Sequence, residues 1–168
     1  MTLVAKILTV SDSTFEGRRD DLAGPALGAR LATAGFEVVE RRLSSDGIAP
    51  VVGALRELCA DFAGLVVTTG GTGFSPRDVT PEATLQVIER EAPGLGEAMR
   101  ASSPFGALSR SRCGTVGNSL IINTPGSLRG ALESLEAILA ILPHALELLA
   151  GGDTTHPPDI GGSTTISS

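Results

Sequence analysis

The sequence predicts an α/β fold, a three-layer α/β/α sandwich with a mostly parallel central sheet. Strand-like and helix-like segments alternate along the first seventy residues, and this alternation is typical of a parallel sheet with helices on both faces. Apolar residues make up 42% of the 168 residues, enough for a globular core without disulfides or a structural metal. Residues 1–150 are therefore expected to form one domain.

The individual elements follow from the spacing of apolar residues and the position of turn residues. Strands are expected at 4–10, 36–42, 65–69, 109–116 and 118–123. Helices are expected at 22–34, 49–62, 81–91, 94–102 and 128–150, the last interrupted by Pro143. Residues 151–168 are rich in Gly, Ser, Thr and Pro, which predicts an extended or mobile C-terminal tail.

Composition excludes some classes of function. The chain has five Phe, no Trp and no Tyr, and its formal net charge is −6. It therefore lacks both the aromatic platforms on which bases stack and a basic stripe that would neutralise a nucleic-acid backbone. Lys6 is the only lysine beside twelve arginines. An anion must therefore be bound by backbone amides, by arginine or through a recruited metal ion, and no nucleic-acid partner is expected.

Cysteine usage and hydropathy predict a cytoplasmic protein. Cys59 and Cys113 lie far apart in the sequence without metal-ligand spacing, as expected for two reduced thiols in a reducing compartment. The apolar run near the N-terminus is short and is typical of a first strand, not of a signal peptide. No run approaches the roughly 20 apolar residues that a membrane helix needs.

The strongest candidate site follows the buried strand at 65–69. In an open parallel sheet, ligands bind beyond the carboxyl ends of the strands. The sequence Thr69-Gly70-Gly71-Thr72-Gly73 has enough glycine for the backbone to approach a ligand and point amides at a phosphate. Thr80 and Pro81 further predict a helix N-terminus, with Thr80 as the N-cap. No Gly-Lys-Ser/Thr follows, so the loop is not a P-loop.

Arg77 and Asp78 lie in the same loop. An Arg-Asp dipeptide is usually a solvated surface pair. A carboxylate beside a phosphate, however, opposes anion binding unless it has a task, and the evident task is to hold Mg²⁺ against the phosphate oxygens. We therefore predict that Asp78 is a metal ligand.

Two further loops are expected at the same edge of the sheet. Ser44-Ser45-Asp46-Gly47 follows the second strand and, taken alone, indicates a turn with an Asx-type hydrogen bond. Asn123-Thr124-Pro125-Gly126-Ser127 follows another strand and opens the last helix. Ser127 is predicted to be its N-cap.

Taken together, these segments resemble one family. TTGGTGFSPRDVTPEAT at residues 68–84 resembles the signature of the MogA/MoaB family of molybdenum-cofactor biosynthesis proteins, which is shared with the gephyrin and plant G domains. The resemblance extends to Val10-Ser11-Asp12-Ser13, to residues 21–27 and to residues 123–127. It covers about residues 3 to 150.

The resemblance implies adenylylation of molybdopterin, in which the terminal phosphate of molybdopterin attacks the α-phosphorus of ATP and pyrophosphate leaves. It implies that Asp46 and Asp78 are the catalytic residues, with Mg²⁺ on Asp78 and Asp46 orienting the pterin or sharing the metal. The residues expected to bind the substrates are Ser11, Asp12, Thr69, Gly70, Gly71, Thr72, Gly73, Arg77, Pro125, Gly126 and Ser127. For Arg77 two alternatives stay open: it offsets the charge that develops on pyrophosphate, or it points away from the substrates.

Other functions remain open at this point. The chain could instead be a non-catalytic carrier paralogue that hands molybdopterin to a molybdenum-inserting enzyme. A nucleotide pyrophosphatase related to CinA is a third candidate, although the loop of that family is closer to Gly-Gly-Leu-Gly-Pro-Thr. The resemblance also implies a homotrimer. The apolar residues of the helix at 128–150 cover more than one face, so part of this helix can be buried between subunits.

Overall fold

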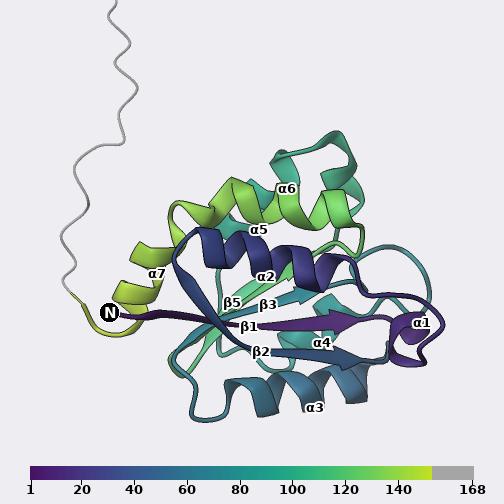
Figure 1. Cartoon of the computed structure of the whole chain (residues 1–168), viewed down its shortest axis with the longest axis horizontal. Helices are drawn as coiled ribbons and strands as arrows, with labels where there is room; N and C mark the ends of the chain where they lie inside the picture. The colour runs from purple at the N-terminus through teal and green to yellow at the C-terminus, as the bar shows by residue number, and fades with distance from the viewer. Residues whose placement is uncertain (153–168) are drawn as a thin grey trace, which may run out of the picture.

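A computed structural model of the chain describes residues 1–152, in which six strands form one sheet (Figure 1). The spatial order of the strands is β2-β1-β3-β6-β5-β4. Their bounds are β1 Leu3–Val10, β2 Phe36–Ser44, β3 Gly64–Thr69, β4 Arg90–Glu91, β5 Cys113–Val116 and β6 Ser119–Thr124. β1 pairs in parallel with β2 and β3, and β3 with β6, while β5 is antiparallel to both β6 and β4. The predicted mostly parallel sheet is confirmed.

Helices cover both faces of this sheet (Figure 1). They are α1 Asp12–Phe15, α2 Ala23–Thr33, α3 Ile48–Cys59, α4 Thr80–Leu85, α5 Pro93–Ala101, the 3₁₀ helix η1 Pro104–Leu108, α6 Leu128–Leu139 and α7 Leu142–Leu149. α2, α5, α6 and α7 bury their apolar residues against one face, and α3 and α4 against the other. The three-layer α/β/α architecture is therefore also confirmed.

The alternation of side chains along β1 explains the two separate cores. Ile7 packs into the cluster that includes α2 and α6, whereas its neighbour Leu8 packs into the cluster beneath α3, because successive strand residues point to opposite faces. All six residues of β3 are buried. This strand lies near the middle of the sheet and anchors the loop that carries the candidate site.

Two of the expected helices have different bounds in the structure. The helix expected at 128–150 is divided into α6 and α7, because Pro143 lies in the first turn of a new helix, where its missing amide hydrogen costs nothing. The helix expected at 81–91 ends at Leu85, and Arg90–Glu91 instead pair with β5. Most of the expected tail, residues 153–168, lies outside the described residues.

The carboxyl ends of β1, β2, β3 and β6 meet at one edge of the sheet, at the right of Figure 1. The chain leaves β1 through α2 on one face and returns from β2 to β3 through α3 on the other face. The loop after β3 leads to α4, which lies on the face opposite α2. The loops after the adjacent strands β1 and β3 therefore diverge, which opens the crevice where ligands bind in such sheets. Within residues 1–152, every helix is too short or too polar to cross a membrane.

Both cysteines are free, and Cys113 is buried beside β6. Burial raises the pKa of the Cys113 thiol to about 11. We expect its reaction with Ellman's reagent at pH 8 to be slower than that of an unfolded thiol by more than about 10²-fold, since the thiolate is the reactive form. Stability gained from burying the neutral thiol is complete below the unfolded pKa and is lost as pH rises toward 11.

Reaction of the Cys59→Ser variant, followed with and without guanidinium chloride, measures Cys113 alone. Equal rates in the two conditions would contradict the burial of this thiol.

Candidate active site

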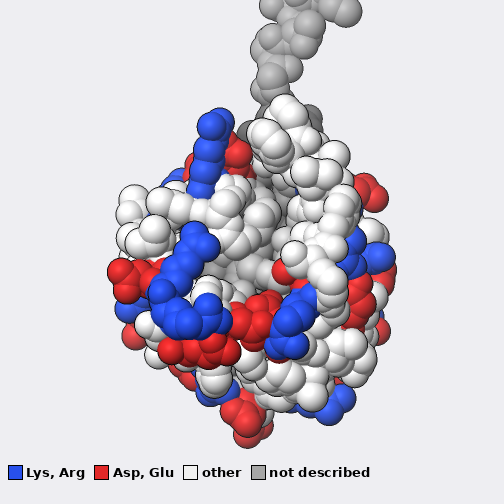
Figure 2. Space-filling model, turned by 90° about the vertical axis from the view of Figure 1, so that its right-hand side faces the viewer, with Lys and Arg blue, Asp and Glu red and all other residues white. Residues whose placement is uncertain are grey.

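A cavity of about 450 Å³ lies at the carboxyl edge of the sheet. It is visible as a hollow in Figure 2, with acidic and basic side chains along its rim. The loops after β1, β2, β3 and β6 all contribute to its wall. The lining residues that the sequence predicted to bind substrate or to act in catalysis are Ser11, Asp46, Thr69, Gly70, Gly71, Asp78, Gly126 and Ser127.

The glycine-rich loop requires glycine at two consecutive positions. Gly70 has a φ of +100° and Gly71 a φ of +67°, which side chains disfavour. A Cβ on Gly70 would lie 2.1 Å from the carbonyl oxygen of Val10, and one on Gly71 would lie 2.2 Å from the Thr80 hydroxyl. The sequence of this loop is thus dictated by its close approach to β1 and α4.

The amides of this loop divide into two groups. The Gly70 amide donates to the carbonyl of Thr124 and so joins the loop to β6. Among residues 1–152, the amides of Gly71, Thr72 and Gly73 donate no hydrogen bond. Three of the four amides that the sequence predicts to bind phosphate are therefore free to do so. Of these three residues, Gly71 and Gly73 also border the cavities.

The expectation that Thr80 caps a helix is wrong. α4 begins at Thr80 itself, with Val79 at the capping position. The Thr80 amide, which has no acceptor within the helix, donates to the carbonyl of Gly71 at 3.0 Å. The buried Thr80 hydroxyl has no hydrogen-bond partner within the described part of the chain. Pro81 lies in the first turn, as predicted.

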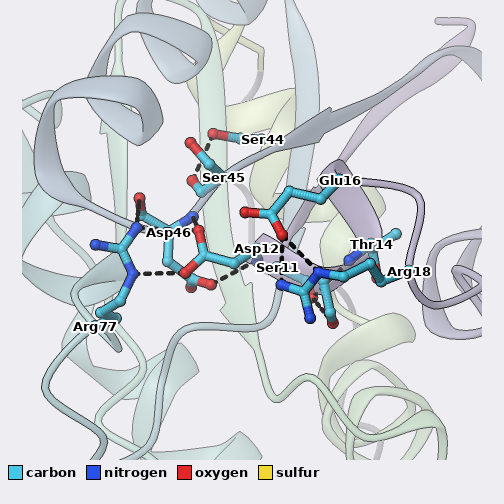
Figure 3. Close-up of polar contacts among 10 residues, drawn as sticks. Ser11, Asp12, Thr14, Glu16, Arg18, Ser44, Ser45, Asp46 and Arg77 are labelled. Atoms are coloured by element: carbon cyan, nitrogen blue, oxygen red, sulfur yellow. Dashed lines mark hydrogen bonds and ion pairs between the residues drawn. The ribbon is translucent and has the colours of Figure 1, made fainter.

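Asp12, Asp46 and Arg77 join three loops (Figure 3). The Asp12 amide donates to the Asp46 carboxylate at 2.8 Å, and the Asp46 amide donates to the Asp12 carboxylate at 3.0 Å. Nε of Arg77 donates to Asp12 at 2.5 Å, and its Nη2 donates to Asp12 at 3.0 Å and to the Asp46 carbonyl at 2.8 Å. In this arrangement Asp12 and Arg77 bind each other, and neither lines the cavity.

The two aspartates of this pair have opposite pKa shifts. The hydrogen bond from Arg77 is the main cause of a lowered pKa for Asp12. Burial is the main cause of a raised pKa for Asp46, to which the charges of Asp12 and Asp78 add. Proximity to two other carboxylates makes the Asp46 charge unfavourable unless a cation is present.

We predict that an NMR titration of the side-chain carboxyls will show Asp46 above the usual aspartate range and Asp12 below it. Because the pKa of Asp46 is raised, ionising this carboxyl costs folding free energy, and stability is lost as pH rises through the folded-state pKa. As pH rises through the pKa of Asp46, the free energy of unfolding of the wild-type protein should therefore fall relative to that of Asp46→Asn. A titration of Asp46 at or below that of Asp12 would contradict the interpretation.

Asp46 and Asp78 suit a magnesium ion that also binds substrate. Both line the larger cavity, and Asp78 accepts a hydrogen bond from the Ser75 amide at 3.0 Å, which orients its carboxylate. Within residues 1–152, no three His, Cys, Asp or Glu side chains form a complete metal cage. Two carboxylates with an open side are what Mg²⁺ uses when phosphates and water supply the remaining ligands.

The loop after β6 is held by its own hydrogen bonds. Ser127 is the N-cap of α6, as predicted, and accepts from the Gly130 amide at 3.1 Å. The Thr69 hydroxyl donates to the Pro125 carbonyl at 2.7 Å. Thr69 therefore joins the glycine-rich loop to the loop of Gly126, and the two loops together bound the cavity.

A second cavity of about 350 Å³ adjoins the first. It shares Gly71, Asp78, Gly126 and Ser127 with the larger one. Among its other lining residues are Phe105 and Leu108 of η1, which are 80% and 53% exposed. The sequence does not indicate this cavity, because η1 lies about thirty residues beyond the glycine-rich motif and carries no motif of its own.

Two polar residues of the site were also missed. Asp21 accepts hydrogen bonds from the Thr9 hydroxyl at 2.8 Å and from the Gly24 amide at 2.9 Å, and so fixes the start of α2 beside the cavity. Arg110, from the segment before β5, binds the carbonyls of Gly73 and Asp78. The spacing of Asp21 before Gly24 was a usable capping signal, whereas nothing in the local sequence marks Arg110.

The fold and the paired cavities define an α/β protein that binds small molecules at the carboxyl edge of its sheet. Among families of known proteins, the one described as "Probable molybdopterin binding domain" matches residues 6–144. The chain belongs to this family, which confirms the resemblance seen in the sequence.

Relatives of known name agree with this assignment. Molybdopterin adenylyltransferase of Helicobacter pylori strain J99 is 36% identical and covers 89% of both chains. Molybdenum cofactor synthesis protein cinnamon of Drosophila melanogaster is 38% identical over 85% of this chain, which spans 25% of that protein's length. The crystal structure of the molybdopterin biosynthesis enzyme MoaB from Thermus thermophilus is 46% identical, with a TM-score of 0.84 over 91% of this chain and 99% of that one.

Proposed function

We propose that this protein adenylylates molybdopterin with ATP. An oxygen of the terminal phosphate of molybdopterin forms a bond to the α-phosphorus of ATP, the bond from that phosphorus to the bridging oxygen breaks, and pyrophosphate leaves with the bonding electrons. The molybdopterin adenylyltransferases among the relatives support this reaction.

The observation that carries the proposal is the meeting of two cavities at Asp78. The cavities of about 450 and 350 Å³ share Gly71, Asp78, Gly126 and Ser127. A transfer between two bound molecules requires this kind of arrangement, because each substrate needs its own cavity while the reacting phosphates meet between them. A pure carrier needs only one of the two.

The residues of the shared wall suit a reaction that depends on positioning and charge neutralisation. The free amides of Gly71, Thr72 and Gly73 would donate hydrogen bonds to phosphate oxygens. Asp78, with Asp46 beside it, would hold Mg²⁺, which supplies positive charge against the triphosphate when bound. The contact between Asp12 and Arg77 would keep the Asp46 loop in place.

The proposal extends to the setting of the reaction. We assign Mg²⁺ as the metal because the ligands present are carboxylates and the remaining positions are open to phosphate and water. We further propose a cytoplasmic homotrimer that passes adenylylated molybdopterin to a molybdenum-inserting enzyme. Sedimentation of the purified protein tests the trimer.

Pyrophosphate release distinguishes the enzyme from the carrier. Purified protein is mixed with ATP and Mg²⁺, and pyrophosphate is measured with and without molybdopterin. The adenylyltransferase releases it only when molybdopterin is present. Tight binding of molybdopterin with no pyrophosphate would reject the enzyme in favour of the carrier, and release from ATP without molybdopterin would instead indicate a pyrophosphatase.

A further inference from the structure

We propose that Arg110 is a positioning residue that holds the Asp78 loop in the geometry needed for adenylyl transfer. This inference rests on the proposed function, which it deepens by assigning a role to a residue outside both cavities. Arg110 lies in the segment before β5, more than thirty residues from Asp78 in the sequence.

Arg110 contacts the loop at three main-chain carbonyls. Its amide donates to the Thr72 carbonyl at 2.9 Å. Its Nε donates to the Gly73 carbonyl at 2.9 Å, and its Nη2 donates to the Asp78 carbonyl. The guanidinium therefore spans both ends of the exposed segment 74–77, and the Asp78 side chain leaves the main chain at one of the held positions.

Other contacts also support the loop, but at other positions than the carbonyls of Gly73 and Asp78. Residues 74–77 are exposed, and the internal bonds of the loop join Asp78 to Ser75, with the Asp78 amide donating to the Ser75 carbonyl at 2.9 Å. These bonds shape the turn but do not attach it to the rest of the domain. Arg77 attaches its side of the turn to the loops of Asp12 and Asp46, and the Thr80 amide donates to the Gly71 carbonyl. Arg110 is the attachment that holds the carbonyl of Asp78 itself.

Glu82 orients the guanidinium from α4. Nη1 of Arg110 forms an ion pair with the Glu82 carboxylate. Burial acts to raise the pKa of Glu82, but the hydrogen bond from Arg110 and its charge bring that pKa below the usual value. The arginine thus joins the Asp78 loop to the helix that follows it.

Arg110 lines neither of the two cavities, so it acts on substrate only through the loop. Lysine would keep the positive charge and could pair with Glu82, but it lacks the planar fork that serves two carbonyls and a carboxylate at once. Arg110→Lys therefore separates the geometry of the contact from its charge. Arg112→Ala is the matched control, because its side chain is half exposed and its nearest acid, Glu91, lies 3.8 Å away.

The test combines hydrogen exchange with kinetics on the full-length protein. In Arg110→Lys we expect the hydrogen-bonded amides of Ser75, Asp78 and Thr80 to exchange at least about tenfold faster than in wild type. We expect kcat for pyrophosphate release to fall about 10²-fold, since small misplacements of reacting groups have effects of this size. The KM values for ATP and molybdopterin should stay within about threefold, and Arg112→Ala should match wild type in every measurement.

The outcomes separate this inference from the proposed function. Unchanged exchange in Arg110→Lys, unchanged kcat despite faster exchange, or a rise in KM alone would each overturn the positioning role. If the wild-type protein releases no pyrophosphate, the proposed function fails instead, and the exchange measurement still decides whether Arg110 holds the loop.

Discussion

Asp78→Asn should lower kcat for pyrophosphate release by about 10³-fold or more and leave the fold and the affinity for molybdopterin nearly unchanged. The substitution removes the negative charge that, in our proposal, binds Mg²⁺. An asparagine oxygen can still accept the hydrogen bond from the Ser75 amide. The loop should therefore keep its shape. Kinetics at saturating ATP together with molybdopterin binding by fluorescence or calorimetry test both parts.

Asp61→Asn is the control for this substitution. Asp61 lies between α3 and β3, at the opposite edge of the sheet from the cavities, and has a φ of +50°. Asparagine tolerates this conformation as well as aspartate does, so activity should be unchanged. Turnover by Asp78→Asn within about tenfold of wild type would remove the metal role from Asp78.

Gly70→Ala should lower the free energy of unfolding by about 2–4 kcal/mol. The new Cβ would lie 2.1 Å from the Val10 carbonyl oxygen, which belongs to the main chain of β1 and cannot rotate away. The φ of +100° adds conformational strain. Either the loop or the end of β1 must move, so activity should be lost together with stability.

Gly53→Ala provides the opposite expectation for the same chemical change. Gly53 lies within α3, and a Cβ there meets no atom within 4 Å. Alanine should therefore raise the free energy of unfolding by about 0.5–1 kcal/mol through its higher helix propensity. Denaturant titration of both variants is the measurement. Equal changes in the free energy of unfolding for the two variants would show that the close approach of Gly70 to Val10 does not affect stability.

The fold could be predicted from the sequence where a local signal also determined the tertiary arrangement. β3 was predicted as a strand because its run of apolar and β-branched residues is short and uninterrupted, and it is buried on both faces. The ends of α4 and of β4 could not be predicted, since Arg90 and Glu91 form a strand only by pairing with Thr115 and Gly114. Long-range pairing overrode helix propensity there.

The same distinction applies to the site. Because ligands bind beyond the carboxyl ends of parallel strands, Asp46, Asp78 and Ser127 were expected to lie at one site. The structure places all three at one cavity. The rule does not predict which side chains pair with one another. The sequence left open whether Arg77 faces pyrophosphate or points away, and in the structure its guanidinium binds Asp12 and the Asp46 carbonyl. Contacts such as that of Arg110 with Asp78 join segments whose separation in sequence leaves no periodic signal.

Above all, we propose that the chain joins two substrates at the wall between its cavities. The mass of the pterin after incubation with ATP and Mg²⁺ tests this most directly. We expect a product heavier than molybdopterin by one adenylyl group, formed in equal amount to the pyrophosphate released and absent with Asp78→Asn. Unmodified molybdopterin bound to wild-type protein, with ATP intact, would contradict it.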